Sequence, residues 1–126
     1  MPDGAVNRPR SLRRLAVALS ALALLVTLAP SAHAANPDPW LGRDKALHFG
    51  ASFALASGGY GGGALLSRRT EVRAVSGAAL ALSAGIAKEV YDRYADGDPS
   101  WRDLTWDVVG TVTGVVVAWL IDRYLF

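Results

Sequence analysis

The sequence lacks cysteine entirely, although it runs to 126 residues. Disulfides, thiolate metal sites and the lipid-modified cysteine of a lipoprotein N-terminus are therefore excluded. Charged residues are also scarce, because they make up 19% of the chain whereas apolar residues make up 52%. That balance is more typical of a membrane protein than of a soluble domain. No stripe of basic residues interleaved with aromatic ones is present, so nucleic acid is not an expected partner.

Residues 1–34 have the pattern of a secretory signal peptide. A basic stretch precedes the apolar run 15–29, and Pro30 and the letters "SAHA" follow it. Ala32 and Ala34 would occupy the two small-residue positions of an A-x-A cleavage site. The apolar run is shorter than the ~20 residues that a spanning helix needs, which favours cleavage over a retained signal anchor. We therefore expect a mature chain of residues 35–126, in which His48 is the one histidine.

Three apolar segments follow, and they cover residues 46–66, 74–87 and 104–122. The first and third are long enough to cross a bilayer as helices, whereas the second must extend into flanking charged residues to do so. Ser100 with Asp103 resembles a capping box before the third segment. We predict an all-α fold, a small up-down-up bundle of three transmembrane or membrane-associated helices. The expected helices cover about residues 44–66, 71–93 and 101–124.

The two connections differ in charge, which predicts an orientation. The first connection, residues 67–73, is rich in arginine, and the second, residues 92–103, is rich in aspartate. Lys and Arg accumulate on the cytoplasmic side of membrane proteins. We therefore expect the first connection in the cytoplasm and the second in the periplasm of a bacterial cell envelope. The mature N-terminus would then be periplasmic and the C-terminus cytoplasmic, in what we expect to be the inner membrane.

This threading would bring polar residues from three helices to one end of the bundle. The candidate site residues are Asp44, Lys45, His48, Ser52, Lys88, Glu89, Asp92, Asp103 and Asp107. Residues four apart share a helical face, and on each helix the polar face continues into a stripe of glycine and alanine. Small residues allow helices to approach closely in lipid, and ionisable groups there avoid facing the hydrocarbon. The candidate residues are therefore expected to face one another inside the bundle.

The chemistry of this cluster has two interpretations. His48 could act as a proton donor or acceptor, or it could pair with a carboxylate and lock the helices together. Lys88 and Glu89 could likewise pair with Asp107 and Lys45 in a functional or a structural role. A cation site formed by His48 with Glu89, Asp103 and Asp107 is disfavoured, because zinc usually takes more His or Cys ligands. No metal or other cofactor is expected.

Three stretches of the sequence resemble a known family. The letters "WLGRDKALHFGAS", "KEVYD" and "SWRDLTWDVVGTVTG" resemble the YfiM-type family of small envelope lipoproteins and, more distantly, VanZ-like membrane proteins. The resemblance covers about residues 38–115 and implies a small helical protein of the cell envelope. This chain departs from the lipoprotein pattern because it has no cysteine to carry a lipid.

Two functions are compatible with these observations. In the first, the chain is a non-enzymatic envelope membrane protein whose polar cluster packs the helices or binds a partner or a lipid head group. In the second, it is a membrane enzyme acting on a lipid-linked or cell-wall substrate, with His48 as acid/base and Lys45 or Lys88 steadying an anion. The expected partners are the lipid bilayer and either a second copy of the chain or another envelope protein.

Overall fold

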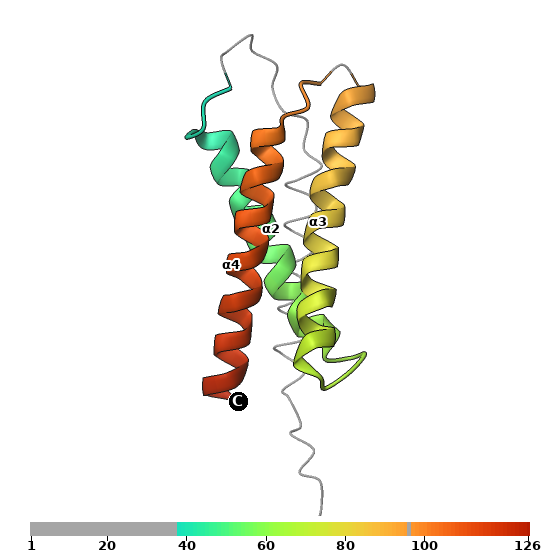
Figure 1. The fold of residues 1–126 in the computed structure, drawn as a ribbon, viewed down its shortest axis with the longest axis vertical. Helices are drawn as coiled ribbons and strands as arrows, with labels where there is room; N and C mark the ends of the chain where they lie inside the picture. The colour runs from blue at the N-terminus through green and yellow to red at the C-terminus, as the bar shows by residue number, and fades with distance from the viewer. Residues whose placement is uncertain (1–37, 96) are drawn as a thin grey trace, which may run out of the picture.

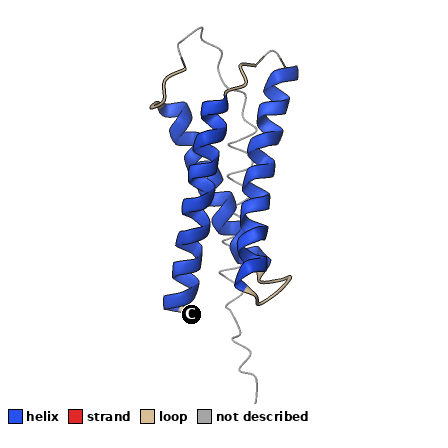
Figure 2. Cartoon of the chain, in the orientation of Figure 1, coloured by secondary structure: helices blue, strands red, loops and turns tan. Residues whose placement is uncertain are grey.

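The computed structural model describes residues 38–95 and 97–126, so the predicted signal peptide lies outside the described residues. The described chain forms three helices, which are α2 (Arg43–Gly63), α3 (Thr70–Tyr94) and α4 (Trp101–Leu125). They run antiparallel in an up-down-up bundle (Figure 1). Figure 2 shows that the remaining described residues form connections and that no strand is present among them. The predicted all-α three-helix bundle is confirmed, and each helix end lies within three residues of its expected position.

Local hydrogen bonds explain where the helices end. The backbone N–H of Asp103 donates to Ser100 Oγ at 3.4 Å, so Ser100 caps α4 as its sequence context predicted. The first helix ends earlier than expected, at Gly63, because the next residues form a tight turn. In that turn the N–H groups of Leu66 and Ser67 both donate to the carbonyl oxygen of Gly63, at 3.0 Å each.

Small residues bring α2 into backbone contact with both other helices. A Cβ atom placed on Gly77 of α3 would collide with the carbonyl oxygen of Ala56, and one on Gly110 of α4 would collide with that of Phe49. The apolar core between them is correspondingly thin and consists of Leu55, Ala56 and Ala81. Because the helices approach this closely, polar side chains at the ends of the stripes meet across the bundle.

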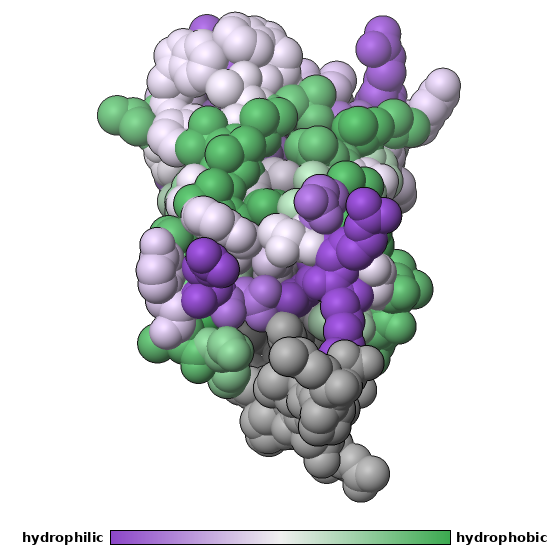
Figure 3. All heavy atoms as spheres, turned by 60° about the horizontal axis from the view of Figure 1, so that its bottom comes forward, coloured by the Kyte–Doolittle hydropathy of each residue, from purple (hydrophilic) through white to green (hydrophobic). Residues whose placement is uncertain are grey.

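The flanks of the bundle are apolar. Large hydrophobic side chains are exposed along all three helices, for example Leu47, Ile86 and Val112. In Figure 3, where the end with the C-terminus comes forward, hydrophilic side chains gather on that end next to the apolar side chains of the flanks. Because the apolar core is small, most of the large hydrophobic side chains lie on the outer surface of the bundle and few are buried between the helices.

Only α4, among the described helices, is both long and apolar enough on average to cross a membrane. We expected the first segment to be able to cross a bilayer too, but the mean hydropathy of α2 is too low for that. Its helix begins with three charged residues and contains six glycines, which lower the mean hydropathy. The second segment falls short as well, because α3 includes the charged residues that flank its apolar stretch.

Candidate functional site

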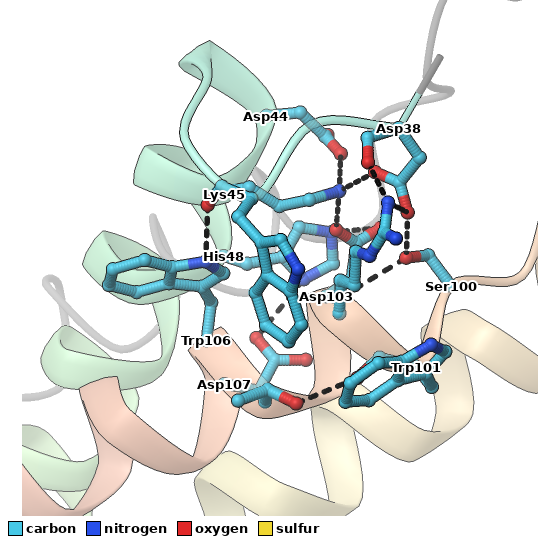
Figure 4. Close-up of polar contacts among 12 residues, drawn as sticks. Asp38, Asp44, Lys45, His48, Ser100, Trp101, Asp103, Trp106 and Asp107 are labelled. Carbon is cyan, nitrogen blue, oxygen red and sulfur yellow. Dashed lines mark hydrogen bonds and ion pairs between the residues drawn. The ribbon is translucent and has the colours of Figure 1, made fainter.

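The polar cluster lies at the end of the bundle where α2 and α4 begin. We define the polar cluster as Asp38, Asp44, Lys45, His48, Asp103 and Asp107, which Figure 4 labels, together with Ser52, which contacts Asp107. Lys45 is 3% exposed, and its ammonium donates hydrogen bonds to the carboxylates of Asp38 and Asp103. It also lies 3.2 Å from Asp44 Oδ2. One buried cation thus joins three carboxylates, and one of them belongs to another helix.

His48 lies between two carboxylates of α4. Its Nδ1 is 3.1 Å from Asp107 Oδ1, and its Nε2 is 3.4 Å from Asp103 Oδ2. Ser52 Oγ donates to the same Asp107 oxygen at 2.7 Å. This arrangement follows from helix periodicity, because His48 and Ser52 are one turn apart on α2, and the two aspartates are one turn apart on α4. Both His48 and Asp107 are buried.

The polar residues of α3 have different partners from those expected. Lys88 Nζ donates to Asp92 Oδ2 at 2.6 Å, one turn further along the same helix. Glu89 accepts a hydrogen bond of 2.6 Å from the backbone N–H of Ser100 and so ties α3 to the start of α4. The predicted pairing of Lys88 and Glu89 with Lys45 and Asp107 is therefore replaced by contacts that organise the last turns of α3 and its connection to α4.

Two residues of this end were missed by the sequence reasoning. Asp38 accepts from Lys45 and, at 2.6 Å, from Ser100 Oγ, while Arg102 donates to its backbone carbonyl oxygen. The hydrogen bonds from Lys45 and Ser100 lower the pKa of the Asp38 carboxyl below its ordinary value. Arg102 also lies over the Trp40 ring, 5.3 Å from its centroid. The nearness of both residues to the predicted helix ends was the available signal.

Several buried polar atoms of this end have no hydrogen-bond partner among the described residues. They include His48 Nε2, Asp107 Oδ2 and Glu89 Oε1. Buried polar atoms are normally satisfied, so such atoms mark places where water, a proton or an ion is accommodated. The cluster therefore combines a hydrogen-bonded frame with a histidine nitrogen that lies 3.4 Å from Asp103 Oδ2 and has no hydrogen-bond partner among the described residues.

A second buried ion pair lies near the opposite end of the bundle. Arg73 of α3 is 3% exposed, and its Nη1 is 2.6 Å from Oδ2 of Asp122 on α4. Its Nε donates to the carbonyl oxygen of Tyr60 at 3.3 Å, and its guanidinium lies 4.3 Å from the centroid of that ring. The Tyr60 hydroxyl donates to Asp122 at 3.2 Å. These three residues, the Arg73 cluster, join all three helices.

No family model matches this chain, and the comparisons with curated proteins and with solved structures find no match. The resemblance to the YfiM-type and VanZ-like families therefore stays a prediction.

Proposed function

We propose that this protein is an integral membrane component of a bacterial cell envelope, in which all three helices span the bilayer. In this proposal its buried ion pairs lock the helices together and it carries out no catalysis. The observation that carries the proposal is the direction of the charged side chains. Within the described helices, every charged side chain that lies between the exposed ends is turned toward the interior of the bundle.

Helix α4 shows this most clearly. Arg102 near its start is half-buried against Asp38 and Trp40, Arg123 near its end is exposed, and the three charged residues between them face inward. Asp103 and Asp107 are buried, and Asp122 is 18% exposed. The outward face therefore carries no charge over 20 residues, or about 30 Å at 1.5 Å per residue. That length is the thickness of the hydrocarbon core of a bilayer.

Helix α3 has the same design. Its exposed charges are Glu71 and Arg93, and they are separated by about 33 Å along the helix. The charged residues between them, Arg73, Lys88 and Glu89 together with the half-buried Asp92, face the other helices. Averaged hydropathy counts these inward charges against a membrane location, although lipid would not contact them. The burial pattern thus supports three spanning helices where the average supports one.

The polar cluster then has a structural task. A charge at the centre of a bilayer costs roughly 2.5–3.5 kcal/mol on insertion scales, and less near the interface. Contacts such as those of Lys45 with Asp103 and of His48 with Asp107 offset this cost only when the helices are correctly packed. The cluster therefore favours one packing of the helices, and the exposed apolar flanks remain available to lipid, a second copy or another envelope protein.

Cysteine accessibility tests the proposal directly, because the chain has no cysteine of its own. Arg69→Cys and Asp98→Cys place single thiols at exposed positions in the two connections. The protein is expected in the membrane fraction after carbonate washing, with position 98 labelled from the periplasm by an impermeant maleimide and position 69 protected. Labelling of position 69 from outside would reverse the topology. Release of the protein by carbonate would contradict the spanning bundle.

A second function is favoured by one observation, the buried Nε2 of His48 that has no hydrogen-bond partner among the described residues. Such a nitrogen could exchange a proton with a substrate, as in the enzyme hypothesis. His48→Gln and Asp107→Asn separate the two functions. Reduced protein levels in the membrane would support the structural lock. Normal levels with loss of the phenotype that the wild-type gene complements would support the enzyme.

A further inference from the structure

We propose that the polar cluster binds a divalent transition-metal ion such as Zn²⁺, with His48 Nε2 and carboxylate oxygens of Asp44 and Asp103 as ligands. One ligand atom from each of these three residues lies within 4.8 Å of the other two. Three protein ligands leave a coordination position for water, as in catalytic zinc sites. This inference does not depend on whether the helices span a membrane.

The environment of the His48 ring is that of a metal ligand. Metal-binding histidines usually donate the N–H of their other ring nitrogen to a carboxylate, which fixes the ring and directs the free lone pair toward the metal. Asp107 Oδ1 lies 3.1 Å from Nδ1 and is itself held by Ser52 Oγ at 2.7 Å. With the proton on Nδ1, Nε2 presents a lone pair that no described residue satisfies.

The two carboxylates are arranged to complete the site. Asp103 gives one oxygen, Oδ1, to Lys45 and directs the other, Oδ2, toward His48 Nε2 at 3.4 Å. Asp44 is one helical turn before His48, and its side chain is 51% exposed, which gives an ion a path from solvent. Nitrogen and oxygen ligands around a tetrahedral zinc lie roughly 3.4 Å apart. Closing the site from 4.8 Å therefore needs a movement of about 1.4 Å, which the exposed Asp44 side chain can supply.

The net negative charge of this group of side chains also favours the binding of a cation. Four carboxylates, those of Asp38, Asp44, Asp103 and Asp107, surround the cationic groups of Lys45 and Arg102. With a neutral imidazole the formal charge of this group is −2, which a divalent ion neutralises. Lys45 holds oxygens of Asp44 and Asp103 at a fixed orientation, as the second-shell partners of metal ligands do.

The sequence disfavours a metal because zinc usually takes more His or Cys ligands. The ligand set considered there was His48 with Glu89, Asp103 and Asp107. In the structure, Asp107 lies behind the ring as its hydrogen-bond acceptor, and Asp44 takes the place of Glu89 in the group with His48 and Asp103. A protonated His48 bridging the two α4 aspartates is the competing explanation of the same geometry, and it predicts no metal affinity.

Metal binding by the full chain tests the inference. The protein, purified with a tag that contains no histidine and stripped with a chelator, is titrated calorimetrically with Zn²⁺, and Co²⁺ provides an absorption spectrum. We expect one Zn²⁺ per chain. Asp44→Asn should weaken binding at least about tenfold and leave the unfolding temperature of the metal-free protein unchanged, because its side chain is half exposed. Asp107→Asn should weaken binding by about 10–100-fold through the ring orientation.

Two matched controls locate the ion. Asp98→Asn removes an exposed carboxylate in the connection before α4 and should leave the affinity unchanged. In the full-length chain, from which the predicted signal peptide has not been removed, His33→Ala removes the other histidine and should also have no effect. The inference is overturned if the wild-type chain binds no stoichiometric Zn²⁺, if Asp44→Asn binds as tightly as the wild type, or if His33→Ala abolishes binding.

Discussion

Replacement of Arg73 by methionine tests the buried ion pair that joins the ends of α3 and α4. The substitution keeps a long side chain that packs against Tyr60 but removes the cation 2.6 Å from Asp122. Asp122 then keeps the Tyr60 hydroxyl at 3.2 Å as a donor, but its partially buried carboxylate loses the ion pair with Arg73. The carbonyl oxygen of Tyr60 loses the hydrogen bond from Arg73 Nε as well.

The expected loss of stability follows from the burial of the pair. Removing one partner of a buried ion pair costs about 3–5 kcal/mol. The Arg73 side chain is 4% exposed and the Asp122 side chain 18%, so solvent relieves part of this cost and we place it near the lower limit, at about 3 kcal/mol. That is roughly a hundredfold change in the unfolding equilibrium constant. In the double variant Arg73→Met/Asp122→Leu, the loss should shrink to about 1 kcal/mol or less, because both charges of the buried pair are removed together.

Reversible unfolding in detergent micelles, followed by helical circular dichroism, measures these differences. Arg68→Met is the matched control, because Arg68 is an exposed arginine in the neighbouring turn and its loss should change stability by less than ~0.5 kcal/mol. Equal stability of Arg73→Met and the control would refute the reasoning. So would a double variant that is less stable than Arg73→Met.

Three further predictions concern packing and protonation. Gly77→Ala should lower the unfolding temperature, because the added Cβ collides with the backbone of α2. Gly62→Ala is the control and should leave the unfolding temperature unchanged, because its Cβ meets no atom within 4 Å. Equal effects of the two substitutions would exclude the backbone contact. Ser52→Ala should destabilise by about 1–3 kcal/mol, because it removes a hydrogen bond to the buried Asp107, and an unchanged unfolding midpoint would contradict that contact. The pKa of Asp38 is lowered in the folded state, so its contribution to stability is present above about pH 4, the ordinary range of the group, and is lost as the pH falls through the folded pKa. The difference in unfolding temperature between wild type and Asp38→Asn should therefore shrink on acidification. A difference that grows would show that the pKa of Asp38 is raised, not lowered, in the folded state.

The helices and the end where the polar residues gather could be predicted from the sequence, for a physical reason. Antiparallel helices of similar length must place their ends at common levels, and residues four apart must share a face. His48 and Asp107 therefore had to lie at one level and on inward faces, and they are 3.1 Å apart. Which oxygen each group contacts depends on side-chain rotamers that periodicity does not specify.

The Arg73 cluster shows what sequence reasoning omitted. Arg73 counts with Arg68 and Arg69 among the positive charges of the connection 67–73, which the positive-inside rule places in the cytoplasm. It also lies four residues before Gly77 and thus continues the same small-residue face, which placed it inside the bundle. If the inward face is followed one turn further on the second and third helices, Arg73 comes next to Asp122, the last acidic residue of the third segment. The count of loop charges thus included Arg73 as an exposed residue, although its position on the helical face indicates that it is buried.

The central claim, that the uncharged outward face lies in lipid, is tested most directly by a spin label at the middle of that face. Val112 is 58% exposed and lies midway between Arg102 and Arg123 on α4. In liposomes, a label on Val112→Cys should collide readily with oxygen and rarely with a polar nickel chelate, whereas one on Asp98→Cys should show the opposite. A label at position 112 that the nickel chelate reaches as readily as it reaches position 98 would contradict the account.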